Sequence, residues 1–109
     1  MSKSIFKMES FAEKVKRLRK EKAVPLRVVS AHLDIDQAII SKIENGKRNA
    51  TRENVIKLAR YYGTNEKEMV VSWLSDKILY DVGKDELALE AIEVAEEKIT
   101  CNNQSDIIK

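Results

Sequence analysis

The chain has 109 residues, 43% hydrophobic and 35% charged, so we expect one small domain whose core would gain from self-association. A single Pro and three Gly favour long helices, and the lack of an 18-residue apolar run argues against a membrane span. No secretory signal is recognisable at the N-terminus and Cys101 has no partner for a disulfide, so we expect a cytoplasmic protein. The net charge of +2 divides into +8 over residues 1–67 and −6 over residues 68–109, which favours a polyanion-binding front half.

Apolar residues at three- and four-residue spacing, together with capping residues, predict six helices. Ser10 and Glu13 form a capping-box pattern at the start of the first helix, and Asp85 should cap the last one. The tail after Ile99 turns polar and is expected to fray. The predicted helices span approximately residues 10–22, 25–33, 37–45, 52–62, 66–80 and 86–99.

The second and third helices form the pattern around which the chain is organised. Val28, Val29, His32 and Leu33 are expected to face inward on the second helix, and Ile39, Ile40 and Ile43 on the third. Asp34 suits the left-handed backbone of a tight turn, Asp36 suits an N-cap, and Gly46 suits a helix stop. A short helix of this kind fits the major groove of DNA.

The run Ile40-Ser41-Lys42-Ile43-Glu44-Asn45-Gly46-Lys47 resembles the "IS+IENG+" run of the phage-repressor-like Xre/Cro regulators. The similarity extends from about residue 11 to 65, and the C-terminal third more weakly resembles small bacterial regulators encoded beside DNA methyltransferases. The resemblance implies an all-α fold, a five-helix repressor-like helix-turn-helix domain with one additional C-terminal helix. The expected parts are an N-terminal extension (1–9), the DNA-binding domain (10–80), a C-terminal dimerisation helix (81–99) and a flexible tail (100–109).

Two groups of residues are candidates for contacting DNA. The outward face of the third helix can read base edges, because Gln pairs with adenine, Lys with guanine, and small side chains contact the thymine methyl group. The loop after it and the start of the second helix can bind phosphates, which positions a protein without reading sequence. The base-reading set is Gln37, Ala38, Ser41 and Lys42, and the phosphate set is Arg27, Lys47, Arg48 and Asn49.

A third group concerns self-association. Helices beyond the five-helix domain commonly mediate dimerisation in the resembled family, and an ordinary monomer core is the competing interpretation. The proposed interface residues are Trp73, Leu74, Ile78, Leu87 and Ile92. The resemblance also implies that Glu44 is structural, with an ion pair to Arg19 or Arg17 on the first helix.

Enzyme chemistry is not indicated. His32 is the only histidine, no paired cysteines stand at metal-ligand spacing, and there is no glycine-rich phosphate loop, so no cofactor or metal is expected. The sequence therefore predicts a sequence-specific regulator that binds double-stranded DNA as a homodimer on a pseudo-palindromic operator. A controller of a restriction-modification operon is one specific candidate. The alternative is an antitoxin-like module whose acidic C-terminal helix binds a basic protein, with DNA binding secondary.

Overall fold

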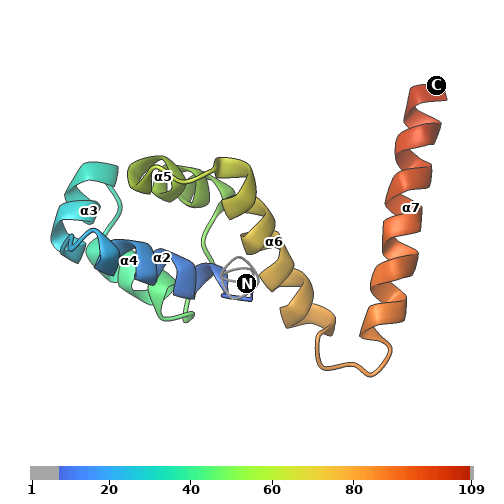
Figure 1. Ribbon diagram of the computed structural model, residues 1–109, viewed down its shortest axis with the longest axis horizontal. Coiled ribbons are helices and arrows are strands. Elements are labelled where there is room, and N and C mark those ends of the chain that lie inside the picture. Colours follow the sequence, from blue (N-terminus) through green and yellow to red (C-terminus); the bar gives the residue numbers. More distant parts are fainter. Residues whose placement is uncertain (1–7, 109) are drawn as a thin grey trace. The chain divides into compact units, whose positions relative to one another are not determined.

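The computed structural model describes residues 8–108, with side chains up to residue 102, and places six helices and no strand in that range (Figure 1). The helices confirm the all-α prediction. They are α2 (Phe11–Glu21), α3 (Leu26–Leu33), α4 (Gln37–Glu44), α5 (Arg52–Tyr62), α6 (Glu66–Val82) and α7 (Ala88–Ile108). Of the N-terminal extension expected over residues 1–9, residues 1–7 lie outside the described part.

The capping box predicted at the start of α2 is formed, and residues next to both ends of α5 cap that helix. Ser10 and Glu13 form a complete capping box at α2, with the Glu13 amide donating to Ser10 Oγ at 3.0 Å and the Ser10 amide donating to Glu13 Oε1 at 2.9 Å. Thr51 Oγ1 accepts the Asn54 amide at 3.1 Å and so caps α5. Gly63 ends α5 in the left-handed conformation with φ of +68°, which glycine adopts without steric cost. Local sequence therefore sets the ends of these helices.

The chain divides into two compact units, one up to Asp76 and one from Lys77 onward. The boundary between them lies within α6. In the first unit, α2 to α5 and the first part of α6 enclose a single apolar core. Its largest fully enclosed side chains are Val15, Val29, Ile40, Ile43, Val55, Leu58 and Met69.

Two inward positions predicted for α3 are wrong. Val28 is 40% exposed and His32 is also exposed, whereas Val29 is fully buried. In a helix Val28 is rotated about 100° from Val29, and the inward stripe runs instead through Leu26, Val29 and Leu33. The His32 ring lies against the Tyr61 ring, with their centroids 4.9 Å apart, at the edge of the core.

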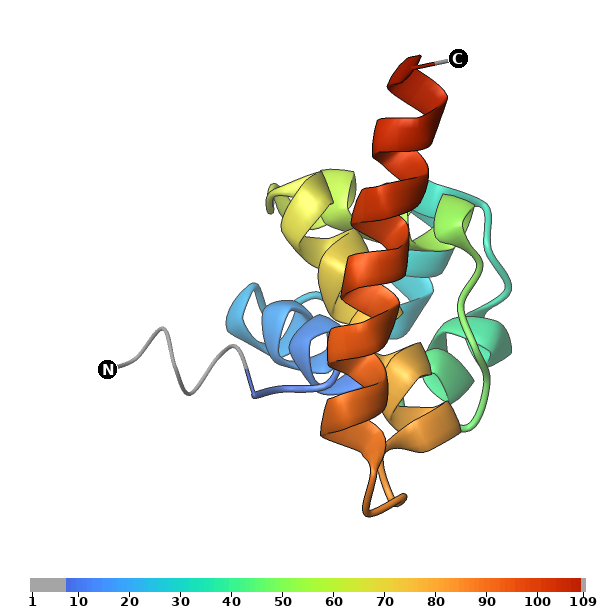
Figure 2. The same cartoon turned by 90° about the vertical axis from the view of Figure 1, so that its right-hand side faces the viewer.

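The second unit comprises the end of α6, a turn and α7. The last helix begins at Ala88 rather than Glu86, because Asp85 first closes a turn in which its Oδ1 accepts the Leu87 amide at 2.9 Å. It continues without interruption to Ile108, so the expected end at Ile99 is wrong (Figure 2). The segment after Ile99 contains neither Gly nor Pro, and Thr100 Oγ1 donates to the Glu96 carbonyl instead of breaking the helix.

Candidate DNA interface

The turn between α3 and α4 fixes the angle at which α4 is presented. Asp34 adopts the predicted left-handed conformation, with φ of +56° and ψ of 45°. Ile35 is 9% exposed and fills the space beneath the turn. The Ile35 amide donates to the Ser30 carbonyl, and the Ser30 hydroxyl donates to the Ile35 carbonyl. Asp36 Oδ1 then accepts the Ala38 amide at 2.7 Å and caps α4 as expected.

The two faces of α4 differ sharply. Ile40 and Ile43 are 0% and 2% exposed and anchor the helix in the core. Gln37, Ala38 and Lys42 are exposed on the opposite face, and Ser41 is half-buried beside them. The structure thus brings the four predicted base-reading residues onto one short helix whose other side is fixed.

The loop after α4 carries the predicted phosphate-binding side chains. Gly46 takes the left-handed conformation that ends the helix, and the Lys47 amide donates to the Lys42 carbonyl at 2.8 Å. Asn45 Nδ2 donates to the Ser41 carbonyl at 2.9 Å, which ties the start of the loop to α4. The side chains of Lys47, Arg48 and Asn49 are exposed, as is Arg27 near the start of α3.

An ion pair braces α4 against α2. Arg19 Nε and Nη2 donate to Glu44 Oε2 and Oε1 at 2.7 and 3.0 Å, and Arg19 Nη1 also donates to the Val24 carbonyl at 3.2 Å. Glu44 is only 5% exposed, so it has no surface to offer to DNA. The structural role expected for Glu44 is confirmed, and its partner is Arg19 rather than Arg17, which pairs with Glu9 and Glu21.

The electrostatics around this brace follow from burial and pairing. The hydrogen bond to Glu44 raises the pKa of Arg19, so the guanidinium stays charged. Burial, and secondarily the Glu44 charge, raise the pKa of Tyr62 to about 12. The phenol is therefore neutral at neutral pH, and the Arg19–Glu44 pair supplies the local charge.

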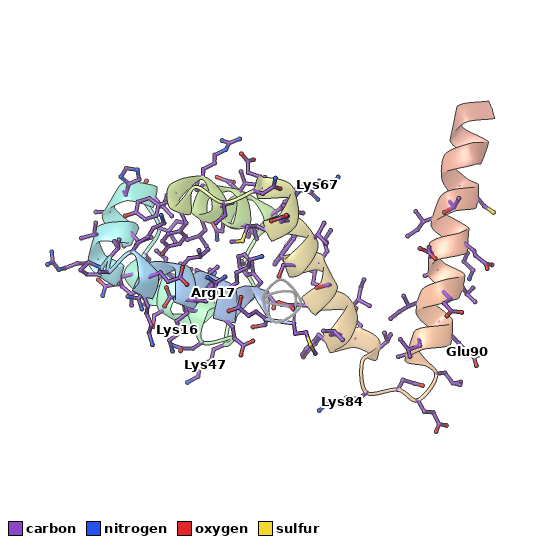
Figure 3. The ribbon with its side chains drawn as sticks, in the orientation of Figure 1. Lys16, Arg17, Lys47, Lys67, Lys84 and Glu90 are labelled. Carbon is purple, nitrogen blue, oxygen red and sulfur yellow. The ribbon has the colours of Figure 1, made fainter. Side chains whose placement is uncertain are left out.

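Lys16 is a candidate that sequence reasoning did not single out. Its Nζ donates to Asn45 Oδ1 at 3.4 Å, which places a cation from α2 next to the end of α4. Figure 3 shows Lys16 and Lys47 along the same edge of the first unit. Only the distribution of charge hinted at this, because the contact joins residues far apart in the sequence.

The predicted self-association residues have different surroundings. Trp73 packs against the core of the first unit, and its Nε1 donates to the Ala50 carbonyl at 3.0 Å, so its own domain covers part of it. On α6, Leu74 of the first unit and Ile78 of the second unit are 40% and 47% exposed. Farther along the second unit, Leu87 and Ile92 are 59% and 37% exposed.

The described residues form no candidate metal site. From residue 8 to 102, no group of three His, Cys, Asp or Glu side chains could hold a metal ion, and Cys101 is exposed as a free thiol. No helix in the described part is long and apolar enough to span a membrane.

Residues 12–74 match the family described as "Helix-turn-helix domain". The chain belongs to the helix-turn-helix family. It is also 38% identical over 60 residues to Control protein C.MunI of Mycoplasma sp, an alignment that covers 54% of this chain and 81% of that protein. No solved structure matches the chain. The family and this relative identify a DNA-binding transcription regulator rather than an enzyme.

Proposed function

We propose that the protein is a sequence-specific regulator that places α4 in the major groove of duplex DNA. The observation that supports this most strongly is the asymmetry of α4. Ile40 and Ile43 hold it from one side, and the polar side chains on the other side are directed to solvent. A helix fixed in this way can insert its exposed face without rearrangement, which limits the entropy lost on binding.

Base reading is assigned to the exposed face of α4. Gln37 lies in the first turn, where recognition helices commonly approach base edges, and its amide can form a bidentate pair with adenine N6 and N7. Lys42 can donate to guanine O6 and N7. Ala38 and the Ser41 methylene offer apolar contact to a thymine methyl group.

Phosphate binding is assigned to the exposed loop and to Arg27. Lys47 and Arg48 carry full positive charges, and Asn49 supplies an amide donor. Lys16 extends the set, because its contact with Asn45 holds it beside the same loop. Contacts of this kind position a domain on DNA and make its affinity depend on salt.

We further propose that the protein acts as a homodimer on a pseudo-palindrome, with recognition helices about 34 Å apart. Leu74 and Ile78 lie four residues apart on α6, and both expose apolar surface to solvent. Leu87 and Ile92 do so farther along the second unit, and Trp73, in the first unit's part of α6, is half-buried. Burial of such surface between two copies is the driving force for association.

The relative's description as a control protein suggests the biological setting. Together with the resemblance to regulators encoded beside DNA methyltransferases, it supports control of restriction-modification genes. A second candidate is supported by α7, where Glu90, Glu93, Glu96 and Glu97 are all exposed. That acidic surface would suit a basic protein partner, which would co-purify with the native protein, whereas a clean dimer supports the regulator.

Selection of bound duplexes from a random pool tests the proposal. The selected sequences should converge on a two-fold symmetric motif. Fluorescence anisotropy on such a duplex should show affinity falling about a thousandfold or more between 50 and 200 mM salt if the dimer makes roughly 6–10 phosphate contacts. A pool without a consensus, or a flat salt response, would contradict sequence-specific binding through these residues.

A further inference from the structure

The phosphate-binding loop has a second attachment, at the end away from α4. Ala50 follows the exposed residues Lys47, Arg48 and Asn49, and it precedes Thr51, the N-cap of α5. Ala50 is only 5% exposed. Its carbonyl oxygen accepts a hydrogen bond from Trp73 Nε1 at 3.0 Å, across 23 residues of sequence.

The two ends of the loop are therefore held by different elements. At the first end, the amides of Gly46 and Lys47 donate to carbonyls of α4 at 3.1 and 2.8 Å. At the second end, the attachment to α6 runs through the Trp73 indole, which itself packs against the core. The exposed segment between these ends spans only residues 47–49, so fixing both ends restricts where its cations can lie.

We propose that Trp73 is a positioning residue for DNA binding, which holds Ala50 and thereby presents Lys47, Arg48 and Asn49 to the phosphate backbone. The inference rests on the proposed role of that loop. A loop that is already ordered loses little entropy when it binds phosphates, and a loop released at one end must be ordered during binding. Trp73 thus supports affinity for any duplex, whereas discrimination between sequences stays with the α4 face.

Trp73→Phe is the informative variant, because it keeps an aromatic ring against the core and removes the indole N–H. Val70→Ala is the matched control, since Val70 is 8% exposed on the same helix and its truncation should lower the melting temperature without touching the loop bond. Each bound phosphate contributes about 0.9 to the logarithmic salt slope, or about fivefold in affinity near 0.15 M salt. We therefore expect Trp73→Phe to weaken binding about fivefold for each phosphate released, equally on cognate and scrambled duplexes, with a correspondingly smaller slope.

Val70→Ala should keep the wild-type salt slope. A folded Trp73→Phe protein with the wild-type slope and affinity overturns the inference while leaving the proposed DNA interface intact. A wild-type protein without salt-dependent binding overturns both.

A second measurement uses the wild-type protein and tests the Trp73–Ala50 hydrogen bond directly. It can overturn the inference even if Trp73→Phe does not fold. Trp73 is the single tryptophan, so its indole N–H gives one NMR signal. We expect that proton to exchange slowly with deuterium, both free and bound to duplex, because it is hydrogen-bonded to the Ala50 carbonyl. Exchange at the rate of a free indole would overturn the inference.

Discussion

The two units of the chain differ in how far buried apolar side chains stabilise them. All the buried apolar side chains of the described residues lie between Phe11 and Val70, within the first unit. In the second unit no described side chain from residue 77 to 102 is buried. The large apolar side chains there are 37–91% exposed, apart from Val82, which is half-buried. The first unit has a core of its own, whereas the second has only helix propensity to stabilise it when it is alone.

This difference in burial indicates that the two units have different roles. The helix that we propose reads DNA must be held rigidly, and α4 is held by the core, by the capped turn before it and by the Arg19–Glu44 pair. A helix with exposed apolar side chains gains its stabilisation when a partner covers them. Substitutions of similar chemistry should therefore have unequal consequences in the two units.

The largest contrast is expected from one truncation made in each unit. Leu58→Ala removes a side chain that is fully buried on α5, and should lower the free energy of unfolding by about 2–5 kcal/mol. Leu89→Ala, at a position 77% exposed on α7, should change it by no more than about 0.5 kcal/mol. Urea unfolding of both variants measures this, and equal losses would show that α7 has a packed core after all.

The next largest effect concerns the brace inside the first unit. Arg19→Met leaves the Glu44 carboxylate enclosed without its ion-pair partner, and should cost about 2–3 kcal/mol because Arg19 itself keeps some contact with water. Lys57→Met is the control, since its pair with Glu53 is exposed and should contribute under about 1 kcal/mol. Thermal melts compare the two variants, and a neutral Arg19→Met would mean that the brace does not hold α4.

Much of the first unit can be predicted from sequence because its determinants are local. Ser10 with Glu13, Asp34, Asp36 and Gly63 each act within a few residues of their own positions. These residues set where helices begin and end, and the apolar spacing then decides which face is buried. The position of α4 in the chain therefore follows from the sequence without knowledge of any tertiary contact.

Contacts between distant residues cannot be predicted in the same way. The Trp73–Ala50 bond, the Lys16–Asn45 contact and the 2.6 Å bond from the Phe11 amide to Asp76 Oδ2 have no sequence signature. Val28 and His32 are predicted wrongly because each lies about 100° around the helix from the next residue, Val29 or Leu33. Those neighbours occupy the inward stripe instead. The end of α7 is predicted wrongly because polar composition alone does not stop a helix.

The next prediction tests whether self-association covers the exposed apolar side chains. Ile78→Glu or Ile92→Glu would bury a carboxylate if the corresponding face is a dimer interface, weakening the dimer by about 1–3 kcal/mol, roughly 5- to 150-fold in the dissociation constant. Tyr80→Glu, at a position 91% exposed and on the opposite side of α6 from Ile78, should change nothing. Sedimentation velocity at tens of micromolar decides, and a wild-type protein that stays monomeric refutes the homodimer.

The smallest effect is expected at the end of the first unit. Burial raises the pKa of Asp76, although its bond to the Phe11 amide acts in the opposite direction. The folded protein therefore binds this proton more tightly than the unfolded chain, and the stability contributed by Asp76 falls as pH rises from the ordinary aspartate pKa of about 3.9 through the raised value. Asp76→Asn should flatten that part of the pH–stability curve, and a curve identical to wild type would exclude a protonation change there.

The most direct test of the central claim compares Gln37→Ala with Arg48→Ala, each first shown to have wild-type helicity and melting. The measurement is the ratio of affinities for the selected duplex and a scrambled one. Gln37→Ala should cost about 1–3 kcal/mol on the selected duplex and little on the scrambled one, so the ratio falls. Arg48→Ala should weaken both equally and reduce the salt slope by about one for each phosphate that is no longer bound. If Gln37→Ala leaves the ratio unchanged while Arg48→Ala collapses it, the face of α4 is not the surface that reads DNA sequence.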